Sequence, residues 1–346
     1  MPMLGVTYPG NNRILIKEFP IPEPGFQQVR IKVKASGICG SDLHHIKMPG
    51  YPGAENRIQG HEPCGFIDKL GPGCGFDLEV GNRVLIAHAV GCGKCYWCRQ
   101  GHFELCEAPW SQRKGWLSYS GFADYTLMPD RNLLPLPDWM SYEVGAYLAC
   151  GAGTAYTSIK KVGASNRDTV VCIGLGPVGL AAVAWAKAFG ARVIGADLIE
   201  YRLELAKKVG ADEVINAKEE KIVERVMELT DNKGATIALD YSGSAEGRTA
   251  MLDCLGMFGK ACYVGETGRV TIEPSRQILG KQLTITGFRI FGIPELMEMT
   301  KLMEEKKVHL ELEKLITHRF HITEFKEAIE TFRSGHSGKV CIIWDD

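Results

Sequence analysis

The feature that most constrains the fold is a regular alternation of apolar runs between residues 168 and 265. Short β-branched runs alternate with longer stretches whose composition suits helices, and Gly residues stand at many of the junctions. This alternation predicts a doubly wound α/β unit, a parallel sheet with helices on both faces. The predicted strands cover 168–174, 191–197, 212–216, 235–243 and 259–265, and the predicted helices cover 177–190, 201–210, 220–230 and 244–256.

The segments on either side of this unit have a different texture. Residues 1 to about 150 are rich in short apolar runs, such as 29–38 and 82–88, punctuated by Gly and Pro. After residue 287 we expect two amphipathic helices and a closing strand, over 293–307, 323–335 and 339–344. We therefore predict that this α/β domain, 152–287, is inserted into a β-rich domain formed by residues 1–151 and 288–346.

A glycine-rich turn follows the first predicted strand of the α/β unit and opens its first helix. A GxGxxG sequence alone is weak evidence, but this strand–turn–helix context is typical of dinucleotide binding, whereas the alternative is a glycine-rich turn without a ligand. The first Gly permits the tight turn, the second lets a pyrophosphate approach the helix N-terminus, and the third permits close helix packing. The predicted cofactor-binding residues of this turn are Gly174, Gly176, Pro177, Val178 and Gly179.

Asp197 ends the next predicted strand and indicates which dinucleotide binds. Its carboxylate can accept hydrogen bonds from both hydroxyls of the adenosine ribose, and it would repel a 2′-phosphate. We therefore expect NAD rather than NADP. Arg202 follows one helical turn later and remains within reach of the ribose edge, which weakens this preference.

Four cysteines in the β-rich part predict a structural metal site. They lie in the stretch GCGKCYWCRQGHFELC. Two residues separate the first cysteine from the second and the second from the third, and seven residues separate the third from the fourth. This spacing lets one short lobe wrap four thiolates around a zinc ion and leaves no open position for chemistry. The predicted ligands are Cys92, Cys95, Cys98 and Cys106.

A second metal site is predicted from residues that are far apart in the sequence. Cys39, His61 and Cys150 are two thiolates and an imidazole, the ligand set of a catalytic zinc with one open position. Such a metal acts as a Lewis acid that lowers the pKa of an alcohol and so eases hydride release to a nicotinamide. Taken singly, each of the three has a structural alternative, as a core thiol or a satisfied buried histidine.

The overall composition excludes several other classes of protein. The net charge is −1, from 40 basic and 41 acidic residues, so neither nucleic acid nor a charged membrane surface is an expected partner. We see neither a signal peptide nor an apolar run of about 20 residues, which predicts a cytoplasmic protein. Small buried side chains are the expected role of the six cysteines outside both sites, namely Cys64, Cys74, Cys172, Cys254, Cys262 and Cys341.

With these motifs the whole chain resembles the zinc-dependent medium-chain alcohol dehydrogenases, a family that includes sorbitol, threonine and sugar dehydrogenases. The carrying motif is Gly60-His61-Glu62-x-x-Gly65-x5-Gly71, together with the lobe spacing. The resemblance implies a GroES-like catalytic domain split around a Rossmann domain. It also implies two zinc ions per chain and hydride transfer between NAD and a primary or secondary alcohol, a polyol or a sugar.

The resemblance assigns further roles around the catalytic zinc. Glu62 resembles a carboxylate that can enter the zinc sphere, and Asp42 resembles the partner that orients the ligand histidine. Ser41 resembles the hydroxyl that takes the alcohol proton, and His44 resembles the end of the relay through the nicotinamide ribose. His45 matches no family role.

Two positions bear on the substrate. Cys150 is similar to the alcohol dehydrogenases proper, because polyol and threonine dehydrogenases are often acidic at this position. His88, four residues before Cys92, stands where simple alcohol dehydrogenases tend to place an aromatic residue. If His88 faces the pocket, the substrate carries additional hydroxyls. The alternative is a polar loop residue near the lobe.

Two other functions remain open, a zinc-free quinone or enone reductase of the same superfamily and a non-enzymatic structural protein on this fold. The reductases generally lack both cysteine sets, and loss of ligand or relay residues would mark a structural protein. The resemblance also implies a homotetramer or homodimer, joined through the strand near 281–288.

Overall fold

The computed structural model describes residues 2–75, 77–109 and 120–345. Its α/β unit is built on a six-stranded parallel sheet with the strand order β10-β9-β8-β11-β12-β13. This order contains the two three-stranded halves of a doubly wound nucleotide-binding sheet. The strands are β8 (Thr169–Ile173), β9 (Arg192–Asp197), β10 (Glu213–Asn216), β11 (Ala235–Asp240), β12 (Leu255–Tyr263) and β13 (Thr284–Gly287).

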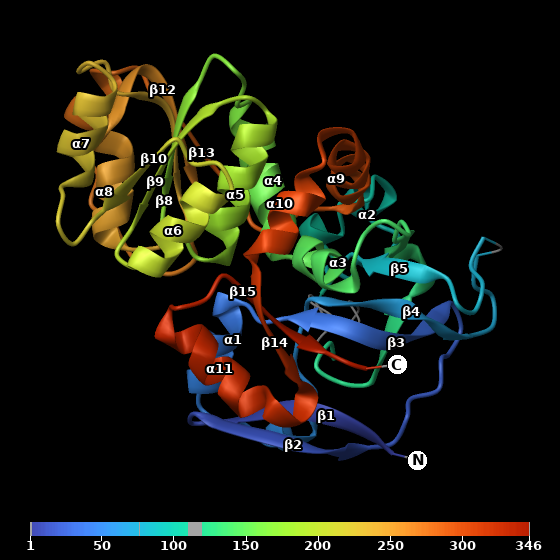
Figure 1. Ribbon diagram of the computed structural model, residues 1–346. Helices are drawn as coiled ribbons and strands as arrows, with labels where there is room; N and C mark the ends of the chain where they lie inside the picture. Colours follow the sequence, from blue (N-terminus) through green and yellow to red (C-terminus); the bar gives the residue numbers. More distant parts are fainter. Residues whose placement is uncertain (1, 76, 110–119, 346) are drawn as a thin grey trace.

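Helices cover both faces of this sheet (Figure 1). On one side lie α4 (Gly151–Val162), α5 (Pro177–Ala188) and α6 (Glu200–Lys208), and on the other α7 (Ile222–Leu229) and α8 (Ala245–Asp253). The strands are buried on both faces, which explains why they read as continuous apolar runs rather than alternating ones. Each strand and helix predicted between 168 and 265 has its counterpart here.

The second large sheet joins the two ends of the chain. β15 (Lys339–Ile343) pairs antiparallel with β3 (Gln28–Gly37), with Ile342 opposite Ser36. Its strand order is β14-β15-β3-β4-β5-β7, and β6 also pairs with β3. The other members are β4 (Pro63–Leu70), β5 (Arg83–Ile86), β6 (Tyr125–Pro129), β7 (Leu133–Pro135) and β14 (Ile316–His321), and a separate hairpin is formed by β1 (Met3–Gly10) and β2 (Arg13–Phe19).

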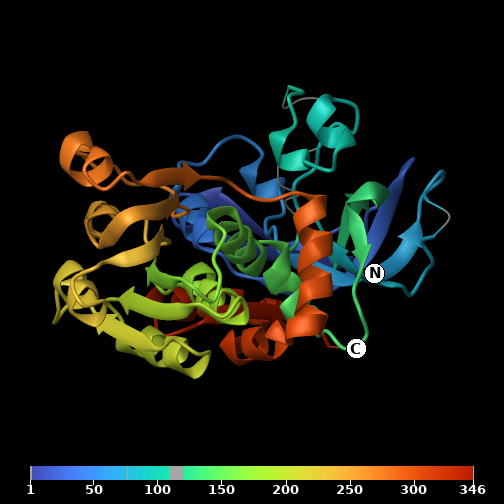
Figure 2. The ribbon, with the colours of Figure 1, turned by 90° about the horizontal axis from the view of Figure 1, so that it is seen from above.

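The other helices lie around this second sheet and between the two sheets. In Figure 2, α9 lies beside the lobe that carries the four cysteines, where the Ile293 N–H donates to the Gly101 carbonyl at 3.0 Å. The helices are α1 (Gly40–Lys47), α2 (Tyr96–Arg99), α3 (Tyr142–Ala149), α9 (Ile293–Lys306), α10 (Val308–Leu315) and α11 (Phe325–Ser334). Short turns of helix are η1 (Ala54–Asn56), η2 (Phe103–Leu105), η3 (Asp130–Asn132), η4 (Ser275–Leu279) and η5 (Ile322–Glu324).

The sequence analysis missed two elements near the C-terminus. It placed two helices and one strand after residue 287, whereas the structure adds α10 and β14 between the two predicted helices. Helix α10 follows α9 after Lys307, whose φ of 53° turns the chain. Both elements are too short to display a clear period of their own, and packing against α5 and β15 defines them.

The scattered cysteines mostly occupy the interior, as predicted. Five are buried and Cys74 is half-buried. Over the described part of the chain, none of the helices combines the length and the apolar character that crossing a membrane requires. The five buried cysteines are Cys64, Cys172, Cys254, Cys262 and Cys341.

Candidate metal and dinucleotide sites

The catalytic candidate is assembled from three separate segments. Cys39 caps the N-terminus of α1, His61 and Glu62 precede β4, and Cys150 lies between α3 and α4. The ligand atoms of all four lie within 4.8 Å of one another. The structure therefore brings together the three predicted zinc ligands and the glutamate beside them.

Local backbone geometry explains how His61 reaches this cluster. Gly60 has a φ of 92°, and a Cβ atom at this position would lie 2.5 Å from the Phe122 backbone nitrogen. Only glycine combines that conformation with that close approach. The signature glycine before the histidine is thus required by the turn that aims the imidazole inward.

Asp42 is hydrogen-bonded to Cys39 and lies close to His61. Its Oδ2 accepts the Cys39 N–H at 2.8 Å, and its Oδ1 lies 4.0 Å from His61 Nδ1 and accepts the Tyr8 hydroxyl at 3.4 Å. Burial raises the pKa of Asp42 to about 6. This arrangement places the carboxylate where an orienting partner of the ligand histidine is expected.

Two buried polar atoms of the cluster, His61 Nδ1 and Glu62 Oε1, make no hydrogen bond to any described residue. Burial alone would lower the pKa of His61, but the hydrogen bond and negative charge of Cys39 outweigh it and raise this pKa to about 9. Two cysteines, a histidine and an adjacent carboxylate form a donor set that suits zinc, so these residues fit the metal that the sequence predicts.

A buried lysine completes the surroundings of Glu62. Lys339, at the start of β15, is 1% exposed and forms an ion pair with Glu62 Oε2. It also donates to the Ile38 carbonyl at 2.9 Å and lies 5.3 Å from the ring centre of Tyr147. Burial raises the pKa of Glu62 to about 7, although the positive charge of Lys339 opposes this shift. The sequence analysis missed Lys339, whose only signal is a charge at the start of an otherwise apolar strand.

The predicted relay residues are placed on α1. Ser41 Oγ lies 3.5 Å from His61 Nε2, on the side of the ring that faces Glu62. His44 is exposed one turn along the helix. His45 lines a separate cavity of about 180 Å³ beside α1, together with Tyr8, Gly10, Met48, Pro49, Tyr51, Arg57 and Gln59.

His88 lies beside the metal cluster and not at the surface. Its ring centre is 5.8 Å from that of His61 and 6.1 Å from that of Phe291. Nδ1 is bonded to the Ala149 carbonyl, while Nε2 is buried without a hydrogen bond from the described chain. Burial, reinforced by His61, lowers the pKa of His88 to about 3, so the ring is neutral. A neutral ring that donates through Nδ1 leaves Nε2 as an acceptor.

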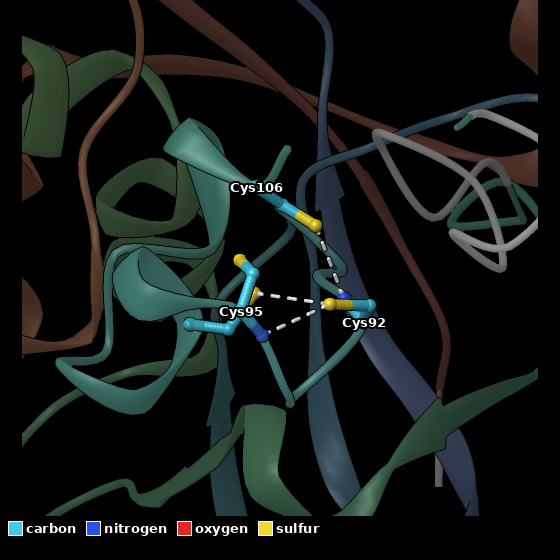
Figure 3. A group of neighbouring side chains, drawn as sticks. Cys92, Cys95 and Cys106 are labelled. Atoms are coloured by element: carbon cyan, nitrogen blue, oxygen red, sulfur yellow. Dashed lines mark hydrogen bonds between the residues drawn. The ribbon is translucent and has the colours of Figure 1, made fainter. Parts of the chain in front are cut away.

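The ligand atoms of the four lobe cysteines lie within 4.8 Å of one another at a second point. Figure 3 shows three of them, Cys92, Cys95 and Cys106. Cys92 Sγ lies 4.0 Å from Cys98 Sγ and accepts the backbone N–H groups of Lys94 and Cys95 at 3.4 Å. These two N–H groups, with that of Lys94 having the larger effect, lower the pKa of Cys92 to about 6. Burial raises the pKa of Cys98 to about 12. Four convergent thiols with backbone donors fit a closed zinc site.

The glycine-rich turn has the geometry of a dinucleotide cradle. Gly174 has a φ of 89°, and a Cβ atom at Gly179 would lie 1.9 Å from the Gly174 carbonyl oxygen. At Gly176, the N-cap of α5, a Cβ atom would meet nothing within 4 Å. The space in front of the helix N-terminus is therefore open for a pyrophosphate. Pro177 and Val178 form the first turn of α5.

Asp197, at the end of β9, lies directly beside this turn. Its Oδ2 accepts the Leu175 N–H at 2.6 Å, and its Oδ1 accepts the Ile199 N–H at 3.0 Å. Arg202 Nη1 lies 3.9 Å from Oδ2. The arginine thus lies beside the carboxylate, and its reach to the ribose edge stays a prediction.

The metal and dinucleotide sites are physically connected. The Tyr147 hydroxyl donates to the Pro177 carbonyl, and the same ring lies under Lys339. Tyr147 is fully buried on α3. One side chain therefore bridges the surroundings of Glu62 and the glycine-rich turn. The sequence contained no signal for this contact.

Comparisons with known proteins place the chain in a family. Residues 25–138 match the alcohol dehydrogenase GroES-like domain, and residues 177–305 match the zinc-binding dehydrogenase domain. The chain is 39% identical, over 99% of each sequence, to an uncharacterized zinc-type alcohol dehydrogenase-like protein of Escherichia coli. It is 36% identical, over 97% of each, to L-threonine 3-dehydrogenase of Pyrococcus horikoshii.

A solved structure supports the same placement. An Escherichia coli protein described as a short chain alcohol dehydrogenase, in complex with NADH, superposes with a TM-score of 0.85 at 28% identity, over 99% of each chain. The split GroES-like and Rossmann fold predicted from the sequence is confirmed. This chain belongs to the zinc-dependent medium-chain alcohol dehydrogenases, a family of oxidoreductases.

Proposed function

We propose that this protein transfers a hydride between NAD and an alcohol that carries further hydroxyl groups, and that it holds two zinc ions per chain. The observation that carries the proposal is the convergence of Cys39, His61, Glu62 and Cys150 within 4.8 Å. The proposal also includes a cytoplasmic location and a catalytic domain of residues 1–151 and 288–346 around a nucleotide-binding domain of 152–287. Pairing of β15 with β3 supports that division.

The chain's own residues account for binding and proton movement. Cys39, His61 and Cys150 would hold the catalytic zinc, with Glu62 as an exchangeable fourth ligand, and the metal supplies Lewis-acid polarisation of a substrate oxygen. Ser41, 3.5 Å from His61 Nε2, is placed to take a hydroxyl proton, and exposed His44 can release it to solvent. The turn of Gly174, Gly176, Pro177, Val178 and Gly179, with Asp197 and Arg202, would bind NAD.

The preference for a hydroxyl-bearing substrate rests on His88. Its ring centre lies 5.8 Å from that of His61. Its acceptor atom, Nε2, is buried and has no hydrogen-bond partner among the described residues. A second substrate hydroxyl could donate to it, whereas a simple alkyl alcohol would leave it unpaired, at a cost of roughly 1–3 kcal/mol. Cys150, which resembles the simple alcohol dehydrogenases, argues for the alternative, a plain primary or secondary alcohol.

The first experiment measures NADH formation with purified protein, in parallel with NADP, before and after chelation. The substrates are simple alcohols, vicinal diols, polyols, aldoses and threonine. We expect zinc-dependent NADH formation with diols or polyols. No NADH formation with any of these substrates, together with no zinc bound at Cys39, His61 and Cys150, would overturn the proposal.

Two variants test the residue assignments. Cys39→Ala should abolish turnover and leave NADH binding nearly intact, with Cys74→Ala as the matched control that keeps both. His88→Phe should shift preference from polyols to simple alcohols by about tenfold in kcat/KM. An unchanged substrate profile in His88→Phe would remove the hydroxyl preference while leaving the dehydrogenase assignment in place.

A further inference from the structure

A buried aspartate joins two loops at the carboxyl edge of the parallel sheet. Asp240 ends β11 and is fully buried. Its Oδ1 accepts the Ser242 N–H at 2.9 Å, the Ser242 hydroxyl at 2.7 Å and the Gly243 N–H at 3.1 Å. Its main-chain carbonyl accepts the N–H groups of Val264 and Gly265 at 3.0 and 2.8 Å. One residue therefore holds both the loop after β11 and the loop after β12.

Arg248 of α8 locks this arrangement. Its Nε donates to Asp240 Oδ2 at 3.1 Å, and its Nη2 donates to the Gly265 carbonyl at 2.7 Å. Arg248 is only 8% exposed, and its guanidinium lies 5.8 Å from the ring centre of Tyr263. Either charge left alone in this environment would be costly, so each requires the other.

The two loops contact each other, and the dinucleotide turn, backbone to backbone. A Cβ atom on Gly268 would lie 2.0 Å from the Gly243 carbonyl oxygen, and one on Gly265 would lie 2.4 Å from the Gly243 nitrogen. A Cβ atom on Gly174 would lie 2.6 Å from the Ser242 nitrogen. A displacement of the loop at 241–244 would therefore also displace the backbone of Gly174, the first glycine of the turn.

The position of this network points to one half of the cofactor. In a doubly wound sheet each three-stranded half receives one mononucleotide at its carboxyl edge. Asp197 ends β9, in the first half, and the network lies beyond β11 and β12, in the second half. We propose that Asp240 and Arg248 are positioning residues that shape the loops 241–244 and 264–268 to receive the nicotinamide half. This inference rests on the proposed function.

The test compares a whole dinucleotide with its adenosine half. In zinc-loaded protein, Arg248→Lys keeps the charge but cannot reach both Asp240 and the Gly265 carbonyl. We expect the Kd for NADH, measured by fluorescence, to rise about tenfold. We expect the Kd for AMP, measured by calorimetry, to change less than about twofold. Arg276→Lys is the matched control, because Arg276 forms an exposed ion pair with Asp253 in the same unit.

A second variant covers the case in which Arg248→Lys folds poorly. Ser242→Ala removes one hydrogen bond to Asp240 and no charge. It should raise the Kd for NADH about threefold and leave the Kd for AMP unchanged. Equal losses for NADH and AMP, or a lowered Tm with both affinities unchanged, would show a purely structural ion pair and overturn the inference. Wild-type protein that binds AMP but neither binds nor uses NADH would overturn the proposed function, and this inference with it.

Discussion

At the scale of single residues, we predict that the choice between NAD and NADP depends on Asp197. Its carboxylate is anchored by the N–H groups of Leu175 and Ile199, and it is 9% exposed. A 2′-phosphate beside it would meet like charge, which costs several kcal/mol. In Asp197→Ala this repulsion disappears while Arg202 remains.

We therefore expect Asp197→Ala to raise the ratio of kcat/KM for NADP over NAD by at least about tenfold. Steady-state kinetics with both cofactors measure this ratio. The double variant Asp197→Ala/Arg202→Ala is the control, and it should lose most of the gain. An unchanged ratio in Asp197→Ala would place the ribose elsewhere.

The ion pair of Lys339 with Glu62 gives a second prediction at this scale. Lys339→Met removes the one cation that pairs with Glu62 Oε2 among the described residues and leaves a buried carboxylate. We expect the free energy of unfolding to fall by roughly 3–5 kcal/mol, because an unpaired buried charge is costly. Denaturant titration measures it. Lys339→Arg should recover part of the loss, and a neutral effect of Lys339→Met would contradict the pairing.

At the scale of elements, the cysteine lobe is the clearest case. α2 and η2 are single turns, and among the described residues they join a small apolar cluster that includes Phe103 and Cys98. We expect a metal bound by the four cysteines to supply the stability that so small a core lacks. Cys98→Ser should therefore release one zinc per chain and lower the Tm by at least about 5 °C. Metal analysis and calorimetry measure both effects, with Cys74→Ser as the control. Retention of two zinc ions would refute the ligand assignment.

Asp212, just before β10, should make the stability of the folded protein depend on pH. Burial opposes ionisation, but the ammonium of Lys187 and the N–H of Val193 outweigh it, so the pKa of Asp212 lies below its ordinary 3.8. A lowered pKa in the folded state stabilises the protein above the unfolded-state pKa, and this stabilisation is lost as the pH falls through the folded-state pKa.

Asp212→Asn should accordingly be less stable at pH 7 by roughly 0.5–1 kcal/mol, discounted for its partial exposure. This difference should shrink below pH 4. Urea titrations from pH 7 to pH 3 measure it, and Asp138→Asn, at a fully exposed side chain, should show almost no difference. A difference that stays constant with pH would exclude the ionised carboxylate as its source.

At the scale of the whole molecule, the open edge of the parallel sheet suggests self-association. β13 is the last strand in the described order, and three exposed apolar side chains belong to the same unit, with exposures of 70% for Met257, 70% for Phe258 and 69% for Leu279. Unpaired edges and apolar patches favour partners. We expect light scattering to give a dimer or tetramer of the 38.1 kDa chain. A monomer at micromolar concentration would contradict this prediction.

The sequence by itself determined what depends on neighbouring residues. The lobe ligands and the turn from Gly174 to Gly179 are recognisable in the sequence because each site is formed by residues close together in the chain. The alternation of strands and helices likewise predicted the parallel sheet. Cys39, His61 and Cys150 were predicted to form one site, and the tertiary structure brings them together. Only the tertiary structure decided that Lys339 pairs with Glu62 and that Tyr147 links Lys339 to Pro177. These contacts join segments far apart in the chain, and their strength comes from burial, which sequence spacing does not encode.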